Sequence, residues 1–210
     1  DGNGNYYYID SIREGRKVFL QDLTGTLVTI AKDVKIQVDF NPGKVQAYRL
    51  IGYANRILRD RDFNDDKIDA GDIGAGHRVT ALYEIVPHGV PAPAFGGVTP
   101  SEYTEPAEPV KVASENWLTV RLRHKKPDGE KSELQKFPLA SNPVALDSAP
   151  QDFVFASGVA LFGMKLRDSD YINDASWAMV SQLVNSGKGV DPHGYRAELI
   201  ELVELAREKK

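Results

Sequence analysis

The sequence predicts an α+β fold, in which a largely antiparallel β-sheet or sandwich region is followed by a C-terminal layer of three helices. Between residues 33 and 147, apolar and polar residues alternate in several short segments, which is the two-residue period of a half-buried strand. From residue 148 onward, apolar residues recur every three or four positions, which is the period of a helix. Strands grouped before helices favour a sheet with helices on one face or at one end.

Residues 1–32 are predicted to form a short strand and a helix ahead of this fold. Residues 6–9 are three tyrosines and an isoleucine, which are typical of strands, and residues 11–23 have helical spacing. The apolar stripe of this helix consists of Ile12, Phe19, Leu20 and Leu23. Such a stripe must find an apolar surface, either in the β-rich region or on a second copy of the chain. We expect the second copy, and therefore a homodimer.

Residues 33–147 are predicted to form the β-rich region. Its expected strands are residues 34–40, 45–51, 79–86, 117–123 and 130–137. The last two strands should form a hairpin through the turn Pro127-Asp128-Gly129. Residues 87–109 hold six of the chain's twelve prolines, so no regular element can run through them. We interpret this segment as a proline-rich arm that is disordered or packed on the surface rather than functional.

Residues 148–210 are predicted to form three helices. A capping box of Ser148 and Gln151 should open the first helix, which is apolar on nearly every side up to residue 166 and is therefore expected to be buried. The second helix should start at Asp174 and stop at Gly187, and the third should start at Asp191. The helices should pack on the sheet and share a core of Phe155, Phe162, Trp177, Leu199 and Val203.

Composition excludes several classes of function. A net charge of −4 argues against a nucleic-acid-binding surface, and the one dense basic run, residues 121–126, is interpreted as the solvated face of an edge strand. No stretch approaches the length of apolar chain that crosses a membrane, and the first residues do not resemble a signal peptide. The chain has no cysteine, which excludes disulfides, thiolate zinc sites and cysteine nucleophiles. Compartment stays open on these grounds.

The sequence contains no complete catalytic motif. The histidines lack the spacing of a zinc hydrolase, and no glycine-flanked serine forms a nucleophile elbow. The glycines at positions 71, 74 and 76 are explained better by turns than by nucleotide binding. We therefore expect no enzyme and no cofactor. An enzyme that uses His77 and Asp72 as a base pair is kept as an alternative.

Residues 60–72 contain six aspartates in thirteen positions. Three of their oxygen side chains fall at alternate positions, as in the first half of a calcium loop, whereas Lys67 replaces the turn glycine and Ile73 replaces the bidentate glutamate. The candidate metal ligands are Asp62, Asn64, Asp66 and Asp72. We favour a structural loop that is ordered without metal, its carboxylates accepting backbone N–H bonds and pairing with Arg59, Arg61 or Lys67. A calcium site is the alternative.

Several segments resemble one bacterial family. They are Arg-Leu-Ile-Gly-Tyr-Ala-Asn-Arg at residues 49–56, Asp-Phe-Asn-Asp-Asp-Lys at 62–67, the run at 69–77, the strand at 80–87 and Gly-Tyr-Arg-Ala-Glu at 194–198. They resemble the domain of unknown function that lies C-terminal to the von Willebrand factor type A domain in YfbK-like bacterial proteins. Residues 2–10 and 25–33 are similar to the last strand and helix of the type A domain running into this region.

The resemblance implies a non-catalytic accessory or interaction domain, placed beside a metal-dependent adhesion module in an exported or lipid-anchored protein. The expected location is the periplasm or the cell surface, with an anchor upstream of this chain. The expected partners are the protein's own upstream type A domain and a further protein, without nucleic acid or direct membrane insertion. The alternative function is a calcium-stabilised adhesion module that uses the loop at residues 60–72. The expected domain division is 1–32, 33–147 and 148–210.

Overall fold

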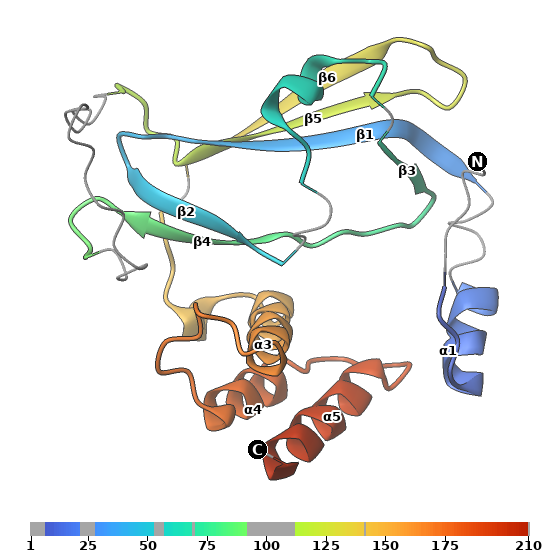
Figure 1. Cartoon of the computed structure of the whole chain (residues 1–210), viewed down its shortest axis with the longest axis vertical. Coiled ribbons are helices and arrows are strands. Elements are labelled where there is room, and N and C mark those ends of the chain that lie inside the picture. The colour runs from blue at the N-terminus through green and yellow to red at the C-terminus, as the bar shows by residue number, and fades with distance from the viewer. Residues whose placement is uncertain are drawn as a thin grey trace. The chain divides into compact units, whose positions relative to one another are not determined.

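The structure is a computed structural model that describes residues 7–21, 28–52, 57–68, 70–91, 112–140 and 142–209. The chain divides into two compact units. The first comprises residues 1–48, 53–79 and 85–141, and the second comprises residues 49–52, 80–84 and 142–210. Antiparallel strands fill the first unit, and three C-terminal helices dominate the second, which confirms the α+β prediction (Figure 1).

A four-stranded sheet has the order β3-β1-β5-β6, with neighbouring strands antiparallel (Figure 1). Its strands are β1 (Thr29–Phe40), β3 (Gly71–Gly74), β5 (Leu118–Lys125) and β6 (Ser132–Leu139). A separate pair contains β2 (Val45–Ile51) and β4 (Leu82–Pro87). The predicted strands at 34–40, 45–51, 79–86, 117–123 and 130–137 correspond to β1, β2, β4, β5 and β6. β3 was not predicted, because its sequence Gly-Asp-Ile-Gly is too short and glycine-rich to show a strand period.

The β1–β5 ladder separates an apolar face of the sheet from a polar face, because directly paired residues of neighbouring strands share a face. The apolar pairs are Ile36 with Leu122, Val38 with Val120, and Phe40 with Leu118. The polar pairs are Lys35 with Arg123, Gln37 with Arg121, and Asp39 with Thr119. The alternation read from the sequence of β1 is therefore the alternation between these two faces.

β5 lies between β1 and β6, so the interpretation of residues 121–126 as part of an edge strand is wrong. The hairpin itself is confirmed, and the N–H of Gly129 donates to the carbonyl oxygen of Lys126 at 2.9 Å in its turn. β1 begins at Thr29, so the predicted domain boundary between residues 32 and 33 falls inside a strand. Asp33 lies at a register irregularity within β1. Its φ is 50°, and aspartate adopts positive φ more readily than most residues.

The predicted N-terminal helix at residues 11–23 corresponds to helical structure over residues 12–21. α1 (Ile12–Arg16) continues into a π-helical turn, η1 (Lys17–Gln21), and Ser11 caps it by accepting the N–H of Glu14. The predicted strand at residues 6–9 is wrong for residues 7–9, which have no regular structure, since a strand needs a neighbour to share its hydrogen bonds. Residue 6 and Leu23 lie outside the described residues.

The second unit contains α3 (Gln151–Leu166), α4 (Trp177–Ser186) and α5 (Tyr195–Lys209). The predicted capping box is wrong, because Ser148 ends a short 3-10 turn, η4 (Leu146–Ser148), and Pro150 occupies the N-cap position without a side-chain bond. A proline at that position holds the preceding residue extended, so the helix cannot begin earlier. α4 begins three residues later than predicted and reaches its expected stop at Gly187. α5 begins at Tyr195, so the predicted start of the third helix at Asp191 is wrong by four residues; the Asp191 carboxylate accepts the N–H of Ala197.

The three helices share one core, as predicted. Its buried members are Phe162, Val180, Val184 and Val203, with Phe155, Leu161, Trp177, Leu199, Ile200 and Ala206 packed against them. α3 buries only one side, since Phe153, Val159 and Leu166 are exposed, so the prediction of burial on nearly every side is wrong. The packing of this layer against the sheet stays a prediction.

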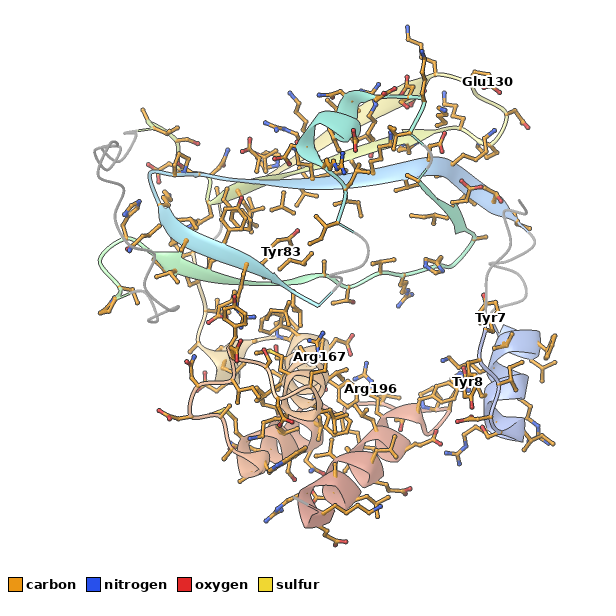
Figure 2. The ribbon with its side chains drawn as sticks, viewed as in Figure 1. Tyr7, Tyr8, Tyr83, Glu130, Arg167 and Arg196 are labelled. Carbon is orange, nitrogen blue, oxygen red and sulfur yellow. The ribbon has the colours of Figure 1, made fainter. Side chains whose placement is uncertain are left out.

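Arg196 ties the helices together at the start of α5 (Figure 2). Its guanidinium bonds to Asp152 of α3 at 2.5 Å and to the carbonyl oxygens of Gly187 and Lys188 at 3.2 and 2.9 Å. The same group lies over the ring of Phe155, 4.8 Å from its centre. These bonds engage the carbonyl groups at the end of α4, which no helical N–H can reach.

Strand residues also belong to this unit. Arg49 forms an ion pair with Glu84 at 2.5 Å, and its guanidinium lies 4.2 Å from the centre of the Tyr171 ring. Residues from the ends of β2 and β4 are therefore joined to the segment between α3 and α4. Among the described residues, every helix is too short or too polar to cross a membrane.

Candidate functional site

The aspartate-rich loop is the densest polar feature predicted from the sequence. Asp62 and Asn64 lie in a 3-10 helix, η3 (Asp60–Asn64), Asp66 follows this helix, and Asp72 lies in β3. Phe63 of the same 3-10 helix is 4% exposed and anchors the loop by its ring. The 3-10 helix and the buried Phe63 ring give this part of the loop a defined structure. The four candidate ligands are thus spread over a 3-10 helix, a turn and a strand.

The carboxylate of Asp66 is bound by the sheet. Ser132 donates to it at 2.5 Å and Arg123 at 3.0 Å, and the ammonium of Lys125 donates to the Asp66 carbonyl oxygen at 3.1 Å. The Ser132 hydroxyl and then the Arg123 guanidinium hold the pKa of Asp66 below its usual value. The cation that the structure places on the Asp66 carboxylate is Arg123 of β5, a residue outside the predicted set of Arg59, Arg61 and Lys67.

Asp33 and Asp72 link the far end of the loop to β1. Asp72 accepts the backbone N–H of Asp33 at 3.2 Å, and Asp33 accepts the N–H of Ala70 at 3.3 Å. The ammonium of Lys125 lies 2.5 Å from the other oxygen of Asp33. This pairing, opposed by partial burial, raises the pKa of Lys125 above its usual value. The register irregularity at Asp33 therefore serves as the attachment point of the segment that leads into β3.

A lysine holds the middle of the loop. Lys35 of β1 is 3% exposed, and its ammonium donates to the carbonyl oxygens of Asp62, at 3.3 Å, and of Asp65. The Asp65 side chain accepts the backbone N–H of Lys67 at 2.9 Å, which closes an Asx turn of the kind predicted for this loop. Lys35 was not among the predicted site residues, because its only signal in the sequence is its place on the polar face of an alternating strand.

Most of the basic run at residues 121–126 is engaged in ion pairs. The pairs are Arg121 with Asp39 at 2.5 Å, Arg123 with Asp66 at 3.0 Å, Lys125 with Asp33 at 2.5 Å, and Lys126 with Glu133 at 2.9 Å. The Lys126 ammonium also lowers the pKa of the Glu133 carboxyl. The basic face of β5 thus neutralises acidic groups of the chain itself.

The sequence left two chemical alternatives open, a calcium site in the loop and a base pair of His77 and Asp72. Within the described ranges, no three histidine, aspartate or glutamate side chains form a group that could hold a metal ion. Asp72 bonds to Asp33, whereas His77 follows β3 in an exposed segment and donates its backbone N–H to Gly74. The proline-rich arm falls largely at residues 92–109, outside the described residues.

The architecture defines the class of the protein as an α+β domain whose acidic loop is held by its own sheet. A family model described as "Uncharacterized protein YfbK, C-terminal" matches residues 25–208, and the chain belongs to this family. It is similar to "Uncharacterized protein YfbK" of Escherichia coli (strain K12), with 43% identity over 205 residues that cover 98% of this chain and 35% of the relative. The chain thus spans about a third of the curated relative it matches. No solved structure gives a match.

Proposed function

We propose that this chain is a non-catalytic accessory domain that makes protein–protein contacts beside a von Willebrand factor type A module in a bacterial exported or surface protein. The resemblance of residues 2–10 and 25–33 to the end of a type A domain supports the proposed neighbour. Periplasmic or cell-surface placement, with an anchor upstream, also rests on the resemblance. The relative's printed name assigns it no activity.

The observation that carries the proposal is the exposed apolar surface of the N-terminal helix. Ile12, Phe19 and Leu20 are 80%, 61% and 76% exposed, and Tyr8 is 74% exposed. Figure 2 shows Tyr8 next to α1. Each large apolar side chain that leaves water is worth about 1.5–3 kcal/mol, so a group of them on one short segment favours contact with another surface. The segment precedes residue 25, where the family model begins, and lies within the alignment to the longer relative.

We propose the upstream region of the same polypeptide as the surface that this helix contacts. The competing occupant is a second copy of the chain, which would make a homodimer when the upstream region is missing. The two occupants use the same side chains and therefore exclude each other. Addition of the upstream region should accordingly convert any dimer into a one-to-one complex.

The test is a titration of the separately produced upstream region into this chain. The parent chain should bind, and replacement of both Phe19 and Leu20 by serine should weaken binding at least tenfold, since two buried side chains are lost. The matched control is Leu205→Ser, which removes a side chain of similar exposure, 54%, from α5 and should leave affinity unchanged. Equal affinity of the parent and the double variant would refute the proposed surface.

Light scattering on two chain lengths tests whether the N-terminal helix contacts a second copy of the chain. A chain that starts at Val28 keeps all of β1 and also keeps the Val28 carbonyl oxygen, which accepts the N–H of Ala75 at 2.8 Å. If the full chain is dimeric and the shorter chain is monomeric, the dimer forms through the N-terminal segment. Monomers at both lengths would contradict self-association through this helix.

The second candidate is a calcium-stabilised adhesion module, favoured by the alternate spacing of Asp62, Asn64 and Asp66. Calorimetric titration of the chain with calcium decides between the two. Heat that saturates at one ion per chain and is lost in Asp62→Asn would favour the adhesion module. Absence of binding at millimolar calcium, the weak end of extracellular calcium modules, would remove it.

A further inference from the structure

The ammonium group of Lys35 lies against the backbone of the aspartate-rich loop. Among the described residues, Lys35 is the one charged residue that is buried, with 3% of its surface exposed. A buried ammonium is costly unless acceptors surround it, and here the carbonyl oxygens of Asp62 and Asp65 accept its hydrogen bonds. Both acceptors belong to the loop, so one side chain fixes two points of the segment.

Two further basic side chains act on the same stretch from the same face of the sheet. Arg123, which is paired directly with Lys35 in the β1–β5 ladder, binds the Asp66 carboxylate. Lys125, two positions along the strand, donates to the Asp66 carbonyl oxygen at 3.1 Å. Residues 62–66 therefore receive hydrogen bonds from three cations of the polar sheet face.

In a calcium loop, the ion gathers alternate side-chain oxygens and a backbone carbonyl oxygen around one point. Here the third alternate side chain, Asp66, is turned to Arg123 and Ser132, while backbone carbonyl oxygens face Lys35. A divalent ion added beside Lys35 and Arg123 would be repelled by two positive charges. The arrangement thus replaces a metal by charges of the protein.

We infer that Lys35 is the built-in cation of the aspartate-rich loop, so that the loop takes its order from this ammonium and not from a metal ion. This inference concerns the loop alone and does not depend on the proposed contact of the N-terminal helix. It makes the order of residues 60–68 insensitive to calcium and to chelators, and sensitive to the charge at position 35.

Hydrogen exchange of the intact chain, read by mass spectrometry over residues 60–68, tests the inference. Lys35→Met keeps the length and apolar stem of the side chain but removes its charge. Exchange in the loop should accelerate by roughly tenfold or more, as expected for loss of hydrogen bonds to a charged group. The matched control is Lys136→Met, which neutralises an exposed lysine on the same sheet face and should leave the loop unchanged. Peptides of β5, which belongs to the same unit as the loop, report whether the variants remain folded.

Chemical rescue separates charge from packing. Because the chain has no cysteine, Lys35→Cys supplies a unique thiol that can be alkylated in denaturant and refolded. Alkylation with 2-bromoethylamine rebuilds an ammonium at position 35, whereas alkylation with 1-bromopropane adds similar volume without charge. The aminoethylated protein should recover slow exchange in the loop, and the propylated protein should not.

Two results would overturn the inference. One is equal loop protection in the aminoethylated and propylated proteins, which decides the matter even if Lys35→Met fails to fold. The other is a parent chain in which millimolar calcium slows, or a chelator accelerates, exchange of residues 60–68. Loss of binding by the N-terminal helix would affect neither readout, so the inference and the proposed function fail separately.

Discussion

Gly158→Ala should destabilise the helical unit, although alanine is the better helix former. A Cβ atom at position 158 would lie 2.7 Å from Cγ1 of Val184, and 3.0 Å from both the Val184 nitrogen and the Leu183 Cβ. These atoms belong to α4 and cannot easily withdraw, because Val184 is completely buried and one of them is backbone. The two helices must therefore separate to accept the methyl group.

Gly163 of the same helix provides the matched control, because a Cβ there has no atom within 4 Å. Glycine to alanine in a helix gains about 1 kcal/mol in either position. Overpacking at position 158 costs about 1–3 kcal/mol, so Gly158→Ala should be less stable than Gly163→Ala by about that amount. The comparison cancels the helix propensity and isolates the contact between α3 and α4.

Urea unfolding of the two variants and the parent, followed by far-ultraviolet circular dichroism, measures this difference. Gly163→Ala should unfold at a higher urea concentration than the parent, and Gly158→Ala at a lower one than Gly163→Ala. Val184→Ala in the Gly158→Ala background should show a favourable coupling, because it removes the Cγ1 atom that the new methyl group meets. Equal midpoints for the two single variants would refute the close approach of α3 and α4.

Three further predictions concern Asp66, the core residues of α5 and the C-terminal helices as a whole. The Ser132 hydroxyl and then the Arg123 guanidinium lower the pKa of Asp66 in the folded protein. The ionised Asp66 carboxylate therefore stabilises the fold at neutral pH, and this stabilisation is lost as pH falls below about 4. Asp66→Asn should therefore flatten the acid limb of a stability–pH profile, and an unchanged limb would contradict the pairing. Val203→Ala, at a fully buried site, and Leu199→Ala, at a partly buried one, should each cost about 2 kcal/mol in urea unfolding. Truncation after Ser148 should leave an insoluble fragment, because strand residues of the second unit lose their helices; a soluble fragment 1–148 with cooperative unfolding would count against this.

The helical unit could be predicted from the sequence because its signals are local. The stripe of Trp177, Val180 and Val184 and the glycine after it are read within three turns of chain, and the five predicted core residues all lie in the observed core. The errors at helix starts also have local causes, such as the proline that shifts the start of α3. The extent of burial around α3 was misjudged, since composition does not show which side of a helix has a neighbour.

The arrangement of the acidic loop could not be predicted in the same way, because its partners are far away in the sequence. Asp66 meets Arg123 and Ser132 across 57 and 66 residues, and Lys35 meets the loop across about 30. The sequence shows which residues are charged but not the strand register that places them together. From the acidic run alone, the expected cations were its sequence neighbours Arg59, Arg61 and Lys67, whereas the cations that bind the loop lie in β1 and β5.

The ion pairs of the basic residues of β5 affect which kind of partner this strand could attract. Arg121, Arg123 and Lys125 each contact an acidic side chain of β1 or of the aspartate-rich loop, so their charges largely cancel at distances beyond the screening length of physiological salt. A run that looks strongly basic in the sequence thus offers little attraction to an acidic partner. The exposed apolar side chains of the N-terminal helix are not compensated in this way within the described residues, because Phe19 and Leu20 remain largely in water. Contact through apolar burial, rather than through charge, is therefore the mode of association that these residues favour.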